Sequence, residues 1–238
     1  MSKIQAIILA GGQGSRLRPY TKILPKPLLP VEDSPICEII IKQLKTFDIT
    51  NIVISTGYLS ELIEAYFGGG KKLGVKISYV KEKKPLGTAG AIKLVDNLED
   101  DFLSINGDIL TDLNFNELLR FHKKSKAVAT ITAKERIVKT DFGVIYFDKA
   151  FNLKDYVEKP EHRSFVSVGI NAFNARCKKY IKSGEYIGIP DLMLRIKSNR
   201  EIVKCFKTKS DWLDLGRHGD FEAAQEVFCA NKNKFLKK

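Results

Sequence analysis

The sequence has little of what marks secreted, metal-binding and membrane proteins. Its four cysteines (Cys37, Cys177, Cys205 and Cys229) stand far apart in 238 residues, which excludes the CxxC spacing of zinc and dithiol redox sites. No apolar run approaches the roughly 20 residues of a membrane-spanning helix. The apolar start IQAIILA continues directly into glycines without a cleavage site. We therefore expect a cytoplasmic protein with reduced thiols and no membrane contact.

Acidic residues are also scarce relative to basic ones. The chain has 40 Lys and Arg against 28 Asp and Glu, a formal net charge of +12. Such an excess is typical of proteins that bind nucleic acid or anionic small molecules. RNA binding would also predict aromatic residues interleaved with basic ones on an exposed sheet, and no such motif occurs. We expect small-molecule ligands and no nucleic acid, with a non-catalytic nucleotide- or RNA-binding protein as the alternative.

Strand-like and helix-like segments alternate through the first half of the chain. Expected strands cover 4–10, 51–56, 75–80 and 101–107. Expected helices cover 35–47 with Ser34 as N-cap, 60–67, 88–98, and 114–124 with Asn114 and Glu117 spaced as a capping box. This rhythm predicts a Rossmann-like, doubly wound α/β sheet, in which ligands bind beyond the carboxyl ends of the strands.

The second half changes character. Short connections separate expected strands at 127–133, 143–148, 152–160 and 165–173, which predict a mixed-sheet extension over the ligand side. A helix at 189–197, a strand at 201–206 and a terminal helix at 219–235 follow. No internal repeat or low-complexity linker divides the chain, so we expect a single domain over residues 1–238.

A glycine-rich loop follows the first expected strand. The stretch LAGGQGSRLRPYTKILPKPLLPV, residues 9–31, places Gly11, Gly12 and Gly14 where backbone amides can cradle a phosphate or meet a nucleobase. The Gly-Lys-Ser/Thr of a Walker A motif is absent, and Leu17 stands where a dinucleotide fingerprint needs its third glycine. A plain glycine-rich turn between strand and helix is the alternative interpretation.

Basic residues in the same stretch favour a phosphate ligand. Arg16 follows the glycines, and Lys26 stands between Pro25 and Pro27, which restrict the backbone on both sides of it. A lysine held in this way loses less entropy when it binds an anion. A proline-rich surface loop with a solvated lysine is the alternative interpretation.

Five motifs together resemble one protein family. The loop at 9–31 resembles the signature of sugar-1-phosphate nucleotidyltransferases, with Tyr20 where leucine is commoner. PLGTAGAI (85–92), NGD (106–108), EKP (158–160) and WLDLGRHGDFEAA (212–224) resemble the later motifs of that family in the same order. The resemblance covers essentially the whole chain. It is greatest to the short guanylyltransferase-like members that act on mannose, glucosamine or heptose 1-phosphate, and it implies a GT-A-like fold without an appended β-helix or CBS domain.

The resemblance implies a reaction and its catalytic residues. A nucleotidyl group would pass from a nucleoside triphosphate to a sugar 1-phosphate, with release of pyrophosphate, in a pathway of nucleotide-sugar and polysaccharide biosynthesis. Asp108 and Asp214 would bind Mg²⁺, which prefers oxygen ligands. Arg16 would hold the triphosphate, and Lys26 would lie against the reacting phosphates. An aspartate at a strand end is otherwise a turn former or helix cap.

The resemblance also implies which residues bind the nucleotide. They are Leu9, Gly11, Gly12, Gly14, Gly87, Thr88 and Gly90, and the donor groups of guanine add Glu82 as an acidic partner. Glu82 would accept the N1–H and N2–H₂ donors of guanine, although Lys81, Lys83 and Lys84 crowd that site. Close packing of helix and sheet is an alternative reason for Gly87 and Gly90. GTP is the expected donor, and uridylyl, thymidylyl and cytidylyl transfer remain open.

Five residues of the second half are implied to bind the sugar phosphate. They are Gly143, Glu158, Lys159, Val168 and Gly169. We therefore expect a nucleotide-binding half at 1–112 and a sugar-phosphate-binding half at 113–238. The SVG sequence at 167–169 departs from the commoner Asn-Ala-Gly, which leaves the sugar open among hexose, hexosamine and heptose. A homodimer is compatible with the sequence, which contains nothing that specifies one.

Overall fold

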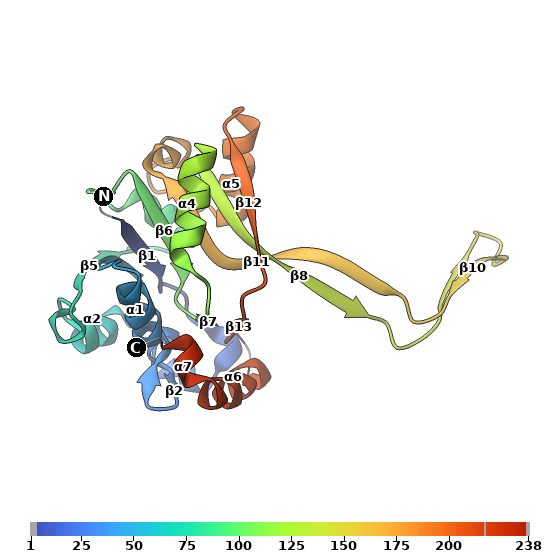
Figure 1. Ribbon diagram of the computed structural model, residues 1–238, viewed down its shortest axis with the longest axis horizontal. Helices are drawn as coiled ribbons and strands as arrows, with labels where there is room; N and C mark the ends of the chain where they lie inside the picture. Colours follow the sequence, from blue (N-terminus) through green and yellow to red (C-terminus); the bar gives the residue numbers. More distant parts are fainter. Residues whose placement is uncertain (1–3, 217, 237–238) are drawn as a thin grey trace.

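The core of the protein is one mixed sheet with helices on both faces (Figure 1). The computed structural model describes residues 4–216 and 218–236. The strand order is β12-β8-β11-β6-β1-β4-β5. These strands are β1 (Gln5–Leu9), β4 (Asn51–Thr56), β5 (Lys76–Lys81), β6 (Asp101–Asn106), β8 (Ala129–Lys139), β11 (Glu161–Asn174) and β12 (Val203–Thr208). Because the sheet includes strands from both halves of the chain, the predicted single α/β domain is confirmed. The functional division at residue 112 stays a prediction.

The alternation of side chains along β1 explains why the sheet is buried on both faces. Ala6 and Ile8 belong to one apolar cluster, whereas Ile7 packs with Val53 and Phe102 in a second one. β1 pairs in parallel with both β4 and β6, so its backbone is hydrogen-bonded on both edges. An apolar strand of this kind is typical of a parallel sheet that is covered by helices.

The helices divide between the two faces. α1 (Ile36–Thr46), α2 (Ser60–Phe67), α4 (Phe115–Ser125), α6 (His218–Ala230) and α7 (Lys232–Phe235) contribute to the larger apolar cluster. α3 (Gly87–Lys93) and α5 (Ile189–Ser198) contribute to the smaller one. β11 alone of the seven strands runs antiparallel to its neighbours. The carboxyl ends of β1, β4, β5, β6 and β8 therefore lie at the same edge of the sheet.

Three local predictions need correction. Ser34 is not the N-cap of α1, because Ser34–Pro35 form the short strand β3, paired with β2 (Pro30–Val31), and α1 begins at Ile36. α3 ends at Lys93, earlier than expected. The expected terminal helix breaks at Asn231 into α6 and α7. The N-cap at Asn114 is confirmed, since its side chain accepts from the Glu117 N–H at 3.2 Å.

A long two-stranded arm extends from the body (Figure 1). We define the arm as residues 135–165, which lie beyond the last pair that β8 makes with β12. β8 and β11 stay paired as far as Lys139 and Glu161, and the hairpin of β9 (Val144–Phe147) and β10 (Leu153–Val157) forms the tip. The expected extension over the ligand side is therefore wrong in its placement. Continuous pairing makes the two strands a ribbon that projects away from the body.

The remaining expectations from composition concern thiols and membranes. All four cysteines are free: Cys37 and Cys177 are buried, and Cys205 and Cys229 are exposed. Within residues 4–216 and 218–236, no helix combines the length and the apolar character needed to cross a bilayer.

Candidate active site

Two adjoining pockets lie at the sheet edge where the parallel strands end. The larger one, about 470 Å³, is lined by loops that follow β1, β4, β5 and β6 and by the start of α3. The smaller one, about 250 Å³, is lined by the glycine-rich loop and Lys26. Both include Leu9, Gly12 and Asp108, so they form one continuous hollow. This is the position that parallel α/β sheets favour for ligands.

Different structural constraints explain the three glycines of the loop. A Cβ on Gly11 would lie 2.6 Å from Glu82 Oε1. Gly14 has φ +60°, and a Cβ there would lie 2.9 Å from Thr21 Cγ2. A Cβ on Gly12 would meet no atom of the described residues within 4 Å, although Gly12 lines both pockets. Packing and the turn therefore explain Gly11 and Gly14, whereas the bare backbone at Gly12 faces open space where a ligand can approach.

Lys26 and Asp108 form an ion pair at the base of the smaller pocket. Lys26 is only 8% exposed, and its Nζ donates to Asp108 Oδ2. Pro25 holds an extended backbone before the short 3₁₀ turn Lys26–Leu28, which aims the side chain inward. Because little solvent screens a buried ammonium group, its attraction for the Asp108 carboxylate, and for a phosphate oxygen that comes as close, is strong.

Asp214 reaches the same place from the end of the chain. β13 (Trp212–Asp214) pairs antiparallel with β7 (Ile109–Thr111), which sets Asp214 opposite Ile109. The Leu215 N–H donates to the Asp108 carbonyl at 3.0 Å. Partial desolvation raises the pKa of Asp214, and the negative charge of Asp108 raises it further, while Lys26 and Arg16 act in the opposite direction. An aspartate whose charge is opposed by a neighbouring carboxylate is, together with that neighbour, a donor set suited to a cation.

Gly216, which the sequence reasoning missed, joins Arg16 to this group. A Cβ on Gly216 would lie 2.9 Å from Asp214 Oδ1 and 3.1 Å from Arg16 Nη2. The guanidinium and the carboxylate therefore both lie against a position that admits no side chain. The signal in the sequence was a glycine two residues after a predicted metal aspartate. The four predicted catalytic residues are thus brought together.

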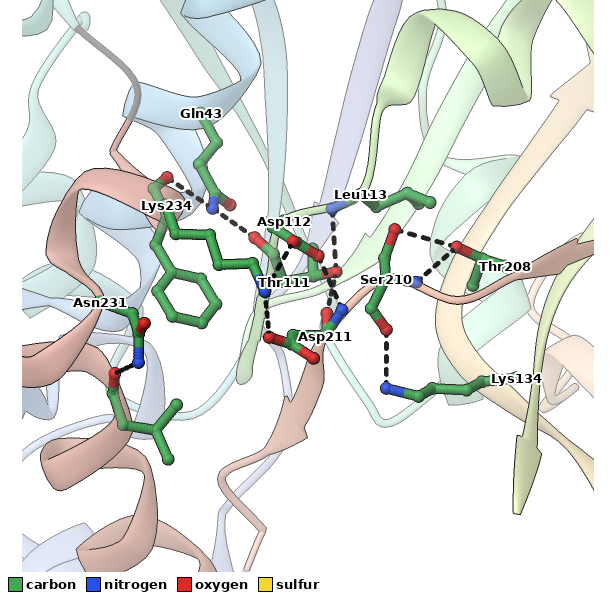
Figure 2. A network of polar contacts seen from close by, with 12 residues as sticks. Gln43, Thr111, Asp112, Leu113, Lys134, Thr208, Ser210, Asp211, Asn231 and Lys234 are labelled. Carbon is green, nitrogen blue, oxygen red and sulfur yellow. Dashed lines mark hydrogen bonds and ion pairs between the residues drawn. The ribbon is translucent and has the colours of Figure 1, made fainter.

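The far end of the β7–β13 ribbon is fixed by α7 (Figure 2). Lys234 forms ion pairs with Asp211 and, at 3.2 Å, with Asp112. The Asp112 carboxylate also accepts from the Asp211 N–H at 2.7 Å, and the Thr111 hydroxyl donates to the Asp211 carbonyl at 2.7 Å. This network fixes the backbone at Asp211, three residues before Asp214. The helix α7 therefore helps to position the Asp214 carboxylate.

The predicted nucleotide residues mostly line the larger pocket. Glu82 is there, but its Oε1 accepts from the Ser55 hydroxyl at 3.0 Å and its Oε2 from the Leu86 N–H at 2.8 Å. Gly87 and Thr88 line the same pocket. Glu82 therefore shapes the turn before α3 and keeps one lone pair on each oxygen for a ligand.

Gly90 lies outside both pockets. It is buried in α3, where a Cβ would lie 2.6 Å from Leu86 Cβ and 3.0 Å from the Glu185 carbonyl oxygen. Gly87 is packed as closely, since its Cβ would lie 2.5 Å from the Ile187 carbonyl oxygen. Close packing, the alternative interpretation, accounts for Gly90 fully and for Gly87 in part.

The predicted sugar-phosphate residues divide between the body and the arm. Val168 is buried, and Gly169, at φ +74°, would place a Cβ 2.6 Å from Asn106 Nδ2. Asn106 itself lines the larger pocket, a role that only its place in the NGD motif indicated. Gly143, Glu158 and Lys159 lie on the exposed arm and line neither pocket. The structure does not bring these three residues to the site within one chain.

Several pocket residues were not among the predicted site residues. Tyr58, Lys83 and Tyr186 line the larger pocket, as does Gly57, where a Cβ would lie 2.9 Å from the Gly11 carbonyl oxygen. Tyr58 and Lys83 follow β4 and β5 directly, so their position after a predicted strand was the available signal. Tyr186 comes from the loop before α5, and nothing local in the sequence places it here.

A family model described as "Nucleotidyl transferase" matches residues 5–231. A UTP–glucose-1-phosphate uridylyltransferase of Synechocystis sp. is 30% identical over 239 residues, which are 92% of this chain and 61% of that protein. A mannose-1-phosphate guanyltransferase of Yarrowia lipolytica is 33% identical over 245 residues, 97% of this chain and 66% of that protein. The chain thus spans less than two thirds of the length of these relatives.

A solved structure gives the same likeness in three dimensions. A Bacillus anthracis protein assigned as a glucose-1-phosphate thymidylyltransferase, in complex with a sucrose, superposes with a TM-score of 0.75. The two are 28% identical, and the alignment covers 94% of each chain. The α/β architecture and the order of its elements are therefore shared along nearly the whole length.

Proposed function

The chain belongs to the nucleotidyl transferase family, and from that premise we propose that it transfers a nucleotidyl group from a nucleoside triphosphate to a sugar 1-phosphate. One observation carries the proposal. Arg16, Lys26, Asp108 and Asp214 come from distant parts of the sequence and converge beside the pocket that the glycine-rich loop lines. Transfer between phosphates needs positioned cations and an open backbone cradle more than it needs a covalent nucleophile.

The residues of the chain fit the parts of this reaction. A sugar phosphate oxygen attacks the α-phosphorus in line, and the bond from that phosphorus to the pyrophosphate oxygen breaks. Lys26 and Arg16 would balance the negative charge that accumulates on the phosphates and the departing pyrophosphate. The loop at Gly11 and Gly12 would lie against the base and ribose. The crowded cations explain how two polyanions can be held close enough to react.

The carboxylate pair fits a magnesium ion. Mg²⁺ usually binds through one or two carboxylates and completes its shell with substrate phosphates and water. Among residues 4–216 and 218–236, no three His, Cys, Asp or Glu side chains gather as a metal site, so the two aspartates match this shared mode. When bound by Asp108 and Asp214, the ion would supply positive charge between the two substrates.

We take GTP as the donor, with a hexose, hexosamine or heptose 1-phosphate as acceptor. Relatives named as mannose-1-phosphate guanylyltransferases support this choice, as does the carboxylate of Glu82 at the larger pocket. A relative named as a uridylyltransferase keeps uridylyl transfer as the second candidate. A cytoplasmic location stays a prediction from the sequence.

The test is release of pyrophosphate. The protein is incubated with Mg²⁺, each of GTP, UTP, CTP, dTTP and ATP, and a panel of sugar 1-phosphates. We expect one productive pair, which names both substrates, and no release with Asp108→Asn. Asp96→Asn is the matched control, because Asp96 is exposed and lines neither pocket. Full activity of Asp108→Asn would contradict the assigned role.

The rival, a non-catalytic nucleotide- or RNA-binding protein, predicts a different set of results. It predicts no release of pyrophosphate with any pair in the panel. It also predicts binding of RNA that weakens steeply as salt is added. Binding at background level in low salt removes this alternative.

A further inference from the structure

The arm exposes apolar side chains that no described part of its own chain covers. Eleven of the eighteen most exposed large apolar residues in the described part of the chain lie between 135 and 165. At the tip, Phe142 is 78% exposed, Phe151 81% and Leu153 67%. Isolated exposed apolar residues are ordinary, but a contiguous series of them marks an interaction surface.

The backbone of the arm also lacks partners. Beyond Lys134, β8 has no neighbour on the side of β12, and β11 pairs with β6 only from Ile170 onward. The arm is therefore a two-stranded ribbon with two open edges, and no residue of 135–165 is buried. Such a ribbon is marginally stable in water, and open edges are sites where another chain pairs. Its stability requires a covering surface.

Charge indicates which partner covers it. The arm has six basic residues and six acidic residues, so its net charge is zero, whereas the whole chain carries +12. All of the excess positive charge therefore belongs to the body. An arm of zero net charge would not attract an acidic partner electrostatically. A second copy of the chain, by contrast, can bury two neutral arms without bringing two basic bodies into contact. A neutral surface with both signs interspersed is suited to pairing with itself about a two-fold axis.

The position of the arm links it to the pocket. β8 runs parallel to β6, so the arm leaves the sheet at the edge where the pocket lies. The cations that line the pocket are Arg16, Lys26, Lys83 and Lys84, which follow β1 and β5. No cation from β8 or β11 lines it, although the proposed reaction brings in a second phosphate. The predicted sugar-phosphate residues Glu158 and Lys159 lie on the arm instead.

We propose that two copies of the chain exchange arms, so that Glu158 and Lys159 of one copy complete the sugar-phosphate side of the other copy's pocket. This inference rests on the proposed function for the role of the two residues. At about 3.3 Å per residue, the strands of the arm span roughly 30 Å, enough to cross a two-fold axis between neighbouring bodies. The ammonium group of Lys159 then supplies the cation that the pocket lacks for the second phosphate.

A mixed dimer tests the exchange directly. One copy carries Asp108→Asn and the other carries both Glu158→Gln and Lys159→Met, with a different affinity tag on each. The two are co-expressed and the mixed dimer is purified through both tags. Each parent alone should be nearly inactive. The mixed dimer should regain about half of the wild-type rate, because one of its two pockets joins an intact body to an intact arm from the other copy.

The interface itself has a matched pair of variants. Leu153 on the arm is 67% exposed and Leu194 on α5 is 64% exposed. We expect Leu153→Ser to shift the protein from dimer to monomer in analytical ultracentrifugation, while Leu194→Ser leaves the dimer unchanged. Both leucines are surface residues, so neither change should prevent folding, and circular dichroism with a melting curve checks this.

The outcomes separate the two proposals. A mixed dimer as inactive as its parents means that each arm serves its own pocket, and it overturns the exchange. A wild-type chain that is monomeric at micromolar concentration also overturns it, and assigns the arm to its own body or to a different protein. An inactive wild type that dimerises, with the dimer lost in Leu153→Ser, rejects the proposed function and keeps the arm as the interface. Full activity of the Glu158→Gln, Lys159→Met parent rejects the role of those two residues.

Discussion

The body and the arm are built from similar strands but differ in what surrounds them. β1 in the body has a neighbouring strand on each edge and apolar contacts on both faces. The strands of the arm are equally rich in aromatic and β-branched residues, yet none of these is buried. The body therefore contains its own core, whereas the arm exposes the side chains that a core would bury, as the proposed interface requires. Four predictions test such differences between neighbouring parts of the molecule.

The largest expected effect separates a buried from an exposed phenylalanine. Phe102 in β6 is fully buried and stacks on Phe173 at 5.6 Å, whereas Phe151 on the arm is 81% exposed. Phe102→Ala should lower the free energy of unfolding by about 3–5 kcal/mol. Phe151→Ala should leave urea unfolding of the monomer nearly unchanged and weaken only the dimer. Equal losses in the two variants would mean that the arm has a core of its own.

The second prediction compares two lysines in the proposed reaction. Lys26→Met removes a buried cation and leaves Asp108 without its partner, so kcat/KM should fall by about 10²-fold or more. Lys159→Met on the arm should raise KM for the sugar 1-phosphate and leave nucleotide binding intact. Steady-state kinetics and nucleotide titration measure the two effects. A loss of nucleotide affinity in Lys159→Met would contradict the assignment of Lys159 to the sugar phosphate alone.

The third prediction compares two glycines of one loop. Gly14→Ala should destabilise the protein by about 1–2 kcal/mol, because Gly14 adopts φ +60°. Gly12→Ala should leave the melting temperature unchanged, since its Cβ meets no atom of the described residues, and should weaken nucleotide binding instead. Unaltered nucleotide affinity in Gly12→Ala would show that no ligand approaches this position.

The smallest effect concerns two surface ion pairs and pH. Hydrogen bonds from the Arg195 guanidinium lower the pKa of Glu185 to about 2, and a hydrogen bond from Lys139 lowers the pKa of Glu161 on the arm. A carboxylate with a lowered pKa stabilises the fold above its ordinary pKa near 4.5, and this contribution is lost as pH falls toward the folded-state value.

Glu185→Gln should therefore reduce the melting temperature at pH 7, and its difference from wild type should narrow below pH 4.5. Glu161→Gln should show a smaller difference, because Lys139 donates through one ammonium group and Arg195 through two nitrogens. Thermal melts between pH 3 and pH 7 measure both. If the difference in melting temperature between a variant and the wild type does not change with pH, the ion pair of that glutamate adds nothing to stability.

Local pattern predicted most of the body. Apolar residues on both faces of β1 and the capping residue Asn114 are signals contained in a few neighbouring residues, and both were interpreted correctly. Ser34 has the residue type of an N-cap, but pairing with Val31 overrides that local preference. Gly216 was missed because its role depends on two side chains that converge from opposite ends of the chain.

The placement of the arm shows a different limit. The strands themselves were predicted from composition, since strand propensity is local. The position of these strands relative to the body was not predicted. It depends on how far β8 and β11 continue to pair and on which surface they contact. The predicted residues of the EKP motif lie in the exposed bend between β10 and β11, and no local pattern indicates which molecule this part of the arm contacts.

The length over which β8 and β11 pair determines how far the arm reaches from the body. Their register runs from Ala133 and Ser167 to Lys139 and Glu161, with each residue of one strand opposite one residue of the other. Deleting or adding the same even number of residues in both strands would change the reach of the tip and keep every side chain on its face. Over evolution, such insertions and deletions can retune the distance between the tip and whatever it contacts without disturbing the sheet.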